Sequence, residues 1–356
     1  MKNLIYSKIP EDIYRPDWLI DEKRDVSKLW LDKNENTDKN LSVFIKNILI
    51  NLKPYTLNSY PVLSKLYLRL ARSIKVSPKN ILLTHGSDGG IKSVFETFVN
   101  PKDYIIRTEP TFAMYSIYSK IYKTKEILVN YKKDFSLDVD LIIKNIKLKK
   151  PKLLCLPNPD SPTGQVVSED KINLILRVAL KNKTFVLLDE AYFEYYKKTN
   201  IHKINKYPNL IVVRTTAKAY GLSGLRVGYL VANNNTIAKL HQTKPMYEIN
   251  YLGAEIFYHL LSKKNNNFIK KIVNDHLIAK KYFVNEIKKM KYSVIKTFSN
   301  FIIIDFNLDT GKILPKIRKI CYFKYYNNGI LMGKVRFSLT NIQNFKKIIK
   351  TIKKAL

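Results

Sequence analysis

The sequence predicts an α/β protein with a mostly parallel central sheet, helices on both faces of that sheet and a small C-terminal α+β lobe. Three observations predict this class. Short apolar runs recur between about residues 81 and 230, each run ends in polar or turn residues, and each is followed by a stretch long enough for a helix. Unbroken apolar character in such short segments is typical of strands that are buried on both faces.

The chain begins with a segment that lacks a periodic pattern and contains Pro10 and Pro16. We interpret residues 1–35 as an N-terminal arm that packs on another part of the molecule. Residues 36–250 are expected to form the large domain, and residues 251–356 the small one. A length of 356 residues agrees with one large domain and a smaller lobe.

The strands of the large domain are expected at five apolar runs, in the order in which they follow along the chain. In open α/β sheets, ligands bind beyond the carboxyl ends of the strands, so the residues after each run are the place to look for chemistry. The runs are 81–83, 104–106, 153–156, 185–188 and 210–213.

The last hundred residues carry a different pattern. Helices are expected at 254–263 and 268–289, strands at 300–304 and 335–339, and a Lys-rich amphipathic helix at the C-terminus. We interpret the basic side of this last helix as a solvated face, with binding to a membrane or a partner as the alternative.

The formal net charge is +34, from 63 Lys and Arg residues against 29 Asp and Glu residues. The excess lysine is spread over the whole chain, which favours a compositional bias over nucleic-acid binding and leaves a weak preference for anionic small molecules. No apolar run approaches the roughly 18 to 20 residues of a membrane span. We therefore expect neither a nucleic-acid partner nor a membrane partner.

The N-terminus and the cysteines bear on location. Charges and prolines stand where a signal peptide would carry an unbroken apolar segment. Cys155 and Cys321 lie far apart, without a CxxC motif or nearby histidines, so neither a disulfide framework nor a metal site is expected. A cytoplasmic location fits these features.

Candidate site residues follow four of the strands. Thr84 to Gly90 places small residues before a helix, where backbone N–H groups can approach an anion; a plain strand-to-helix turn is the alternative. Pro157 to Gly164 (PNPDSPTG) is a rigid turn. Asp189 ends an apolar strand, and a buried carboxylate requires a cation or a donor, although Asp189 could instead cap the next helix.

The fourth of these segments contains the residue of greatest chemical interest. Lys218 lies among small residues in an apolar, glycine-rich stretch, a setting that favours a Schiff base on its amine. Arg226 follows eight positions later (226 − 218) and is a strong fixed cation suited to a phosphate dianion.

These four segments, in this order, resemble the fold-type-I aminotransferases that use pyridoxal 5′-phosphate (PLP), most closely the histidinol-phosphate aminotransferase branch. The resemblance covers nearly the whole chain and implies an aspartate-aminotransferase-like fold, PLP as cofactor and a homodimer. Further stretches that match the family are 31–36 (LDKNEN), 58–61 (NSYP), 110–115 (PTFAMY), 299–301 (SNF) and 334–337 (KVRF).

The resemblance implies a role for each matching residue. Lys218 would form the Schiff base and move the substrate proton, Asp189 would pair with the pyridine nitrogen, and Tyr192 would donate to the ring oxygen. Phe112 would stack on the ring, with core packing as the alternative. The remaining cofactor contacts would come from Gly86, Ser87, Asp88, Thr215 and Arg226 at the phosphate, from Ser161 at the ring oxygen and from Tyr60 of a partner subunit.

Substrate would be bound by Arg336, Asn34 and Asn300, with Arg336 on an anionic group and a structural salt bridge as its alternative. The chain departs from the family near these contacts. Ser161 replaces an asparagine, Ala217 a serine and Gly89 an acidic residue, Lys324 or a neighbour stands for a second arginine, and 245–250 differs from the usual substrate segment.

We expect an aminotransferase that runs two half-reactions, with a small and phosphorylated carbonyl compound as acceptor. The departures lead to the hypothesis of a relative of histidinol-phosphate aminotransferase with a different acceptor. Decarboxylation of a phosphorylated amino acid is the alternative within PLP chemistry, since cofactor motifs do not discriminate the two reactions. A PLP-fold binding protein without catalysis is a third possibility, against which the retained Lys218, Asp189, Tyr192 and Arg226 argue.

Overall fold

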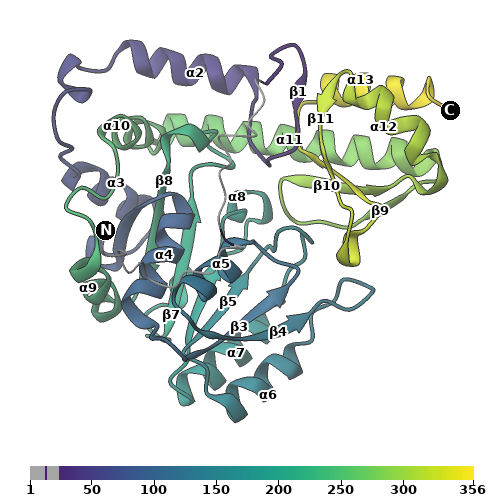
Figure 1. Ribbon diagram of the computed structural model, residues 1–356. Helices are drawn as coiled ribbons and strands as arrows, with labels where there is room; N and C mark the ends of the chain where they lie inside the picture. Colours follow the sequence, from purple (N-terminus) through teal and green to yellow (C-terminus); the bar gives the residue numbers. More distant parts are fainter. Residues whose placement is uncertain (1–12, 14–23) are drawn as a thin grey trace, which may run out of the picture.

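The computed structural model describes residue 13 and residues 24–356. A seven-stranded sheet with the order β2-β8-β7-β6-β5-β3-β4 forms the centre of the molecule (Figure 1). β8 runs antiparallel to both of its neighbours, and the other pairs are parallel. The strands are β2 (Ile81–His85), β3 (Tyr104–Glu109), β4 (Lys125–Asn130), β5 (Leu153–Pro157), β6 (Phe185–Asp189), β7 (Leu210–Thr215) and β8 (Val227–Ala232).

Helices cover both faces of this sheet because the residues of each strand alternate between two cores. Leu188 belongs to the core under α3, α6, α7 and α10, whereas Leu187 belongs to the core under α4, α5 and α9. The expected α/β fold class is therefore confirmed. The helices of this part are α2 (Lys39–Ile50), α3 (Ser64–Ile74), α4 (Gly86–Phe98), α5 (Met114–Ile121), α6 (Val139–Lys149), α7 (Glu169–Lys181), α8 (Phe193–Tyr196), α9 (Asn234–Thr243) and α10 (Tyr251–Leu260).

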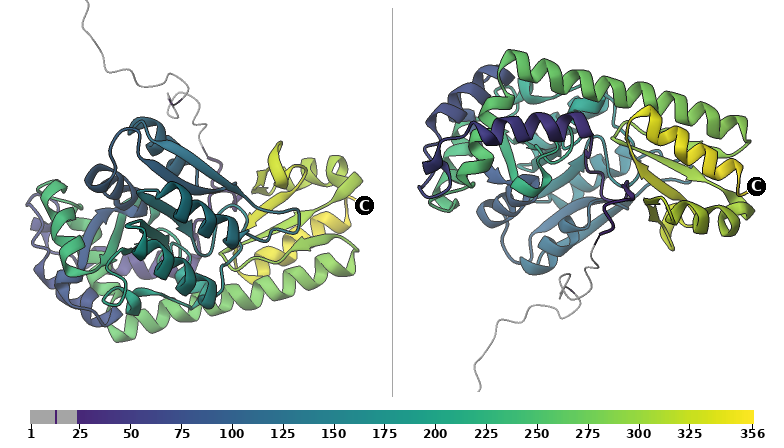
Figure 2. Two further views of the ribbon diagram at one scale, coloured as in Figure 1. Left: turned by 90° about the horizontal axis from the view of Figure 1, so that it is seen from below. Right: turned by 90° about the horizontal axis from the view of Figure 1, so that it is seen from above.

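A second, four-stranded sheet forms the small lobe, with the order β12-β13-β10-β9. The long helix α11 (Lys263–Lys289) runs from the large part of the molecule into this lobe, as both views of Figure 2 show. The remaining elements of the lobe are β9 (Ser293–Ile295), β10 (Phe301–Asp305), α12 (Thr310–Arg318), β11 (Cys321–Tyr322), β12 (Lys324–Tyr325), β13 (Val335–Ser338) and α13 (Ile342–Lys353).

The described end of the N-terminal segment packs on the small lobe, where β1 (Leu29–Trp30) pairs in parallel with β11. Arg24 forms ion pairs with Asp32 and Glu35, and its guanidinium lies 4.5 Å from the ring centre of Trp30. Arg24 is thus held by its own chain, while Arg15 lies outside the described residues.

We propose the division into residues 1–35, 36–250 and 251–356 as the domain organisation. Packing crosses its limits at two points, because β1 joins the small lobe and α10 contacts α2 and α3.

All five strands expected in the sheet are present, but β4 and β8 were not expected. β4 begins with Lys125 and Glu126, and such an edge strand has less apolar sequence than a central one. β8 is buried throughout, but it directly follows the lysine motif, so the sequence does not mark it as a separate strand. None of the described helices is long and apolar enough to cross a membrane.

Candidate active site

The predicted site residues meet at the carboxyl ends of β5, β6 and β7, which is where a parallel sheet is expected to bind its ligand. One cavity lies there, between the end of the sheet and the first turn of α4. Nine of its lining residues were expected from the sequence: Ser87, Asp88, Phe112, Ser161, Asp189, Tyr192, Thr215, Lys218 and Arg226.

Asp189 forms the floor of this cavity. Its Oδ1 accepts the backbone N–H of Ala191, and its Oδ2 accepts the hydroxyl of Tyr115, each at 2.9 Å. Burial raises the pKa of Asp189 to about 6, against these two hydrogen bonds and the charge of Lys218, which lower it. The carboxylate is thus costly to ionise until a cationic or donor group arrives from the cavity.

Two residues of this environment were not singled out from the sequence. Tyr115 is fully buried near the start of α5, and its ring meets that of Phe112 edge to face, with ring centres 6.0 Å apart. Asp160 of the PNPDSPTG turn accepts from Thr163 and Thr111, and burial raises its pKa to about 7. The Asp160 side chain therefore closes the turn on itself at Thr163 and joins the turn to Thr111, which lies between β3 and α5.

An anion-binding cradle lies at the opposite end of the cavity. α4 begins at Gly86, where φ is +72°, a conformation that favours glycine. A Cβ at Gly86 would lie 2.8 Å from Nη2 of Arg226, and one at Gly228 would lie 2.7 Å from the backbone nitrogen of Ser87. Only glycines allow β8, this helix N-terminus and the guanidinium to meet so closely.

The first turn of α4 offers its backbone rather than its carboxylate. Oδ1 of Asp88 accepts the hydroxyl of Tyr118 at 2.9 Å, so this carboxylate already has a donor. The N–H groups of the turn and the nearby Arg226 carry positive potential toward the cavity. The hydroxyl oxygen of Thr215 accepts the backbone N–H of Ala217 at 3.1 Å, which leaves its proton for a ligand.

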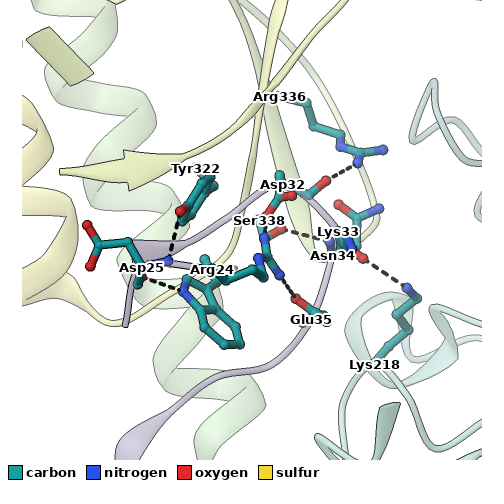
Figure 3. A network of polar contacts seen from close by, with 11 residues as sticks. Arg24, Asp25, Asp32, Lys33, Asn34, Glu35, Lys218, Tyr322, Arg336 and Ser338 are labelled. Carbon is teal, nitrogen blue, oxygen red and sulfur yellow. Dashed lines mark hydrogen bonds and ion pairs between the residues drawn. The ribbon is translucent and has the colours of Figure 1, made fainter. Parts of the chain in front are cut away.

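Lys218 stands between the two ends of the cavity and is half-buried. Its Nζ donates to the backbone carbonyl of Lys33 at 3.4 Å (Figure 3). The same Nζ lies 5.8 Å from the ring centre of Tyr192. The amine is therefore within reach of the same ligand as Asp189, and its present partner is a single neutral carbonyl.

The segment after β1 brings the predicted substrate residues beside this amine. Asn34 has a left-handed φ of 57° and donates its side-chain N–H to the hydroxyl of Tyr192 at 3.0 Å. Asn300 donates to the backbone carbonyl of Asn34 at 2.9 Å. The asparagines thus join the N-terminal segment, the small lobe and the cavity wall.

Arg336 lies in β13 and approaches from the small lobe (Figure 3). Its Nη2 donates to the backbone carbonyl of Asp32 at 2.5 Å, and its buried Nε has no hydrogen-bond partner in residues 24–356. No ion pair of Arg336 occurs among the described residues, so the structural salt bridge considered as an alternative is absent there. The guanidinium has donors to spare for an anion.

Tyr60 is the one predicted cofactor residue that lies away from the cavity. It is 72% exposed and stacks on Tyr247, with ring centres 4.2 Å apart. Among the departures from the family, Ser161 lines the cavity, and Ala217 does so without a hydroxyl. No group of three or more His, Cys, Asp or Glu that could hold a metal ion occurs in the part of the chain that the structure describes.

An amine, a buried carboxylate and an anion cradle in one cleft of this α/β fold define a PLP-dependent enzyme of fold type I. The residues fit that cofactor: Asp189 matches a protonated ring nitrogen, Lys218 its aldehyde, and the glycine-lined cradle its phosphate.

Comparison with known proteins identifies the family. The model of "Aminotransferase class I and II" matches residues 26–312, and the chain belongs to this family of PLP-dependent aminotransferases. It is 34% identical to a histidinol-phosphate aminotransferase of Caldanaerobacter subterraneus subsp. tengcongensis over 94% of this chain and 93% of the relative. It is 38% identical to a histidinol-phosphate aminotransferase of Thermoanaerobacter sp. (strain X514) over 80% of this chain and 78% of the relative.

Solved structures support the same fold. Histidinol-phosphate aminotransferase from Sinorhizobium meliloti in complex with pyridoxal-5′-phosphate superimposes with a TM-score of 0.80. The superposition covers 92% of this chain and 90% of that one, at 18% sequence identity. The chain is therefore an aminotransferase that resembles the histidinol-phosphate branch in sequence and in fold.

Proposed function

We propose that this aminotransferase, a relative of the histidinol-phosphate aminotransferases, moves an amino group between an amino acid and a small phosphorylated carbonyl compound. The observation that carries this proposal is Arg336, whose spare donors lie beside the segment that contacts Lys218. The names of the relatives at 34% and 38% identity support the same substrate class.

The residues divide the chemistry among them. When bound, PLP supplies an electron-accepting ring that stabilises the charge left on a substrate carbon after that carbon loses a proton. Lys218 takes this proton on Nζ and returns it to a different carbon. Asp189 would keep a proton on the ring nitrogen, because a buried carboxylate is stabilised by a cationic partner.

Binding and orientation fall to the surrounding groups. The backbone of Ser87 and Asp88, the hydroxyl of Thr215 and the guanidinium of Arg226 hold the cofactor phosphate, and Phe112 covers the ring. Tyr192, held by the Asn34 amide, donates to the ring oxygen.

Substrate binding follows from the contacts of the N-terminal segment. The anionic group of the substrate replaces the neutral Asp32 carbonyl on Arg336, since a charged acceptor binds a guanidinium more strongly. Asn34 and Asn300 fix the position of this segment beside Lys218, so that the substrate amine would reach the cofactor's aldehyde carbon and take the place of Nζ there.

The test follows the visible absorbance of the purified protein with PLP, to which histidinol phosphate, glutamate, glutamine, alanine and phosphorylated amino acids are added one at a time. Loss of the cofactor band with a donor and its return with 2-oxoglutarate or a phosphorylated ketone would establish transamination. A robust rate with histidinol phosphate and 2-oxoglutarate would reject the hypothesis of a different acceptor. A persistent band with release of carbon dioxide would favour the decarboxylase. No response to any of these substrates would favour the PLP-fold binding protein without catalysis.

We also propose a homodimer in which Tyr60 reaches the cofactor of the partner subunit. Its exposure of 72% supports this, because most of the Tyr60 side chain is left open to contact with a second chain. Mixing Tyr60→Ala protein with Lys218→Ala protein tests it. Hybrid dimers would contain one intact site, and about a quarter of wild-type activity would return. No return of activity would contradict a shared site.

We propose a cytoplasmic location on the basis of the cysteines. Cys155 and Cys321 are both free and buried, as suits a reducing compartment. Fractionation of cells that express the tagged chain would test this, with recovery outside the cytoplasm as the contrary result.

A further inference from the structure

A second cavity, of about 610 Å³, lies on the other face of the central sheet from the cofactor pocket. Its walls come from α3, from the region where α10 meets α11, from residues that follow β6 and β7, and from Arg214 in β7 and Tyr229 in β8. The volume falls within the range of pockets that hold small organic molecules. None of the catalytic or cofactor-binding residues proposed above lines it.

The two cavities share strands without sharing side chains, because neighbouring residues of a strand point to opposite faces. Asp189 and Thr215 point into the cofactor pocket, and Arg214, next to Thr215, lines the second cavity. Glu190, next to Asp189, pairs with that Arg214. The second cavity is thus built directly behind the cofactor site.

Most of the lining is apolar. Aliphatic side chains come from the helices on both sides, and the rings of Phe193, Tyr220 and Tyr229 close the end toward the sheet. The aliphatic residues include Leu70, Ile74, Leu261, Ile269 and Val273. A ligand with an apolar or aromatic body would gain by displacing water from these walls.

The buried cation of the cavity already has its partners. Nε and Nη2 of Arg214 donate to Oε2 of Glu190 at 3.1 and 2.7 Å, and Nη2 also donates to Thr199 at 2.7 Å. The guanidinium lies 3.6 Å from the ring centre of Phe193. Arg214 therefore has no need of an anionic ligand.

The carboxylate of Glu194, in contrast to Arg214, lacks partners from neighbouring residues. It lines the cavity, and no side chain or backbone N–H of another described residue donates to it or forms an ion pair with it. Burial raises its pKa to about 7, although the charge of Arg214 acts to lower it. The residue is half-buried, and the donor that its carboxylate has is its own backbone N–H, so a cationic ligand would supply the partner that the other described residues do not.

Exposed cations lie around the same cavity. Lys75, Lys197 and Lys270 line it and are exposed, so that the cavity presents positive charges to solvent and one unpaired negative charge within. A simple cation would be repelled by these lysines, and a simple anion would find no buried partner. A ligand that carries both a positive and a negative charge can pair with Glu194 and with the lysines at the same time.

We propose that this cavity binds a zwitterionic α-amino acid with an apolar side chain. Its ammonium group donates to Glu194, its carboxylate faces the lysines, and its side chain packs between α3 and α11. The site is independent of the amino acid that reacts at Lys218, and its existence does not depend on the substrates proposed for the enzyme.

Binding is tested on the holoenzyme by calorimetry at pH 8 with three matched probes. N,N-dimethyl-L-phenylalanine is zwitterionic, and its tertiary amine forms no Schiff base with PLP. 3-Phenylpropionate lacks the amine, and N,N-dimethyl-2-phenylethylamine lacks the carboxylate. We expect the zwitterion to bind at least tenfold more tightly than either truncated probe, since each charge contributes an interaction of that order.

Variants identify the site. Glu194→Gln is expected to weaken the zwitterion and the amine about tenfold and to leave 3-phenylpropionate unchanged. Lys197→Met, at an exposed position, is expected to weaken the zwitterion and 3-phenylpropionate instead. Glu96→Gln, a half-exposed carboxylate of α4 remote from this cavity, is the matched control and should change neither. Unfolding by urea checks that each variant is folded.

Several results would overturn the proposal. These are equal affinity for the three probes, tightest binding of 3-phenylpropionate, unchanged binding of the zwitterion in Glu194→Gln, or no binding to the wild type at millimolar concentrations. An altered cofactor absorbance on adding the zwitterion, together with unchanged affinity in Glu194→Gln, would place the probe in the active site and equally reject the second site. None of these results bears on the transamination assays, so the failure of either proposal is recognisable by itself.

Discussion

Replacing Tyr115 by phenylalanine tests how the protein sets the ionisation of its cofactor carboxylate. The Tyr115 hydroxyl donates to Oδ2 of Asp189 at 2.9 Å in a fully buried setting. A hydrogen bond to a charged group contributes about 1.5 to 3 kcal/mol, and each pKa unit corresponds to about 1.36 kcal/mol. Loss of the hydroxyl therefore raises the pKa of Asp189 by about one to two units.

The pH at which the effect appears follows from the value in the intact protein. Since the pKa of Asp189 is about 6 there, most of the carboxylate is ionised at pH 7. In Tyr115→Phe the midpoint moves to about 7 to 8, so roughly half to nine-tenths of Asp189 is protonated at pH 7. Only the ionised carboxylate can pair with a protonated ring nitrogen, so cofactor affinity should fall about two- to tenfold at pH 7 and recover near pH 9.

The measurement is a titration of the cofactor-free protein with PLP, followed by absorbance between pH 5 and 9. Tyr292→Phe is the matched control, because the Tyr292 hydroxyl donates to Asp309 at 2.7 Å in the small lobe, away from the site. Its curve should coincide with that of the wild type. Coincident wild-type and Tyr115→Phe curves would show that this hydroxyl does not govern the ionisation of Asp189.

Three further predictions concern stability and packing. Asp189→Asn should stabilise the cofactor-free protein by up to about 3 kcal/mol at neutral pH and abolish transamination. The pKa of Asp189 in the folded protein, about 6, exceeds the ordinary value of 3.8. The free-energy cost of ionising Asp189 is therefore absent below pH 4, grows between pH 4 and 6, and reaches its full value above pH 6. Urea unfolding at pH 4 and 7 measures this, and equal gains at both would contradict it. Gly228→Ala should weaken PLP binding and cost about 1 to 3 kcal/mol, because its Cβ would lie 2.4 Å from the carbonyl carbon of Gly86; unchanged PLP affinity would show that the cradle can adjust. Glu190→Leu should cost about 3 to 5 kcal/mol in urea unfolding by leaving buried Arg214 unpaired, and a loss below 1 kcal/mol would show that another group neutralises it.

The sequence predicted the central part of the molecule because two physical rules apply there. Strands buried on both faces need unbroken apolar runs, which identified five strands, and parallel strands end at one edge, which brought Asp189 and Lys218 together. Neither rule applies to β4, which lies at the edge of the sheet and carries charged residues. Edge strands have weaker patterns because one side meets solvent.

Other parts of the site depend on contacts that no local pattern encodes. Lys218 and Arg336 both donate to backbone carbonyls of the segment that precedes Asn34, and any residue type provides such a carbonyl. The pairing of β1 with β11 joins residues about 290 positions apart, so its register is invisible in a local reading of the sequence. The proposed role of Tyr60 requires a second chain and cannot be derived from the pattern of one.

Alternation along β6 and β7 gives the strand ends two functions at once. Asp189 and Thr215 project toward α4 and α5, where the cofactor pocket lies, while Arg214 projects toward α3 and α11 and pairs with Glu190. A displacement of either strand end would move both sets together, because adjacent residues share a backbone. Occupancy of the second cavity is then expected to alter the surroundings of Asp189. In the wild type, the zwitterionic probe should therefore shift the pH midpoint of PLP binding. In Glu194→Gln, the probe should leave that midpoint unchanged. An identical midpoint with and without probe would mean that the strands are too rigid to couple the two faces.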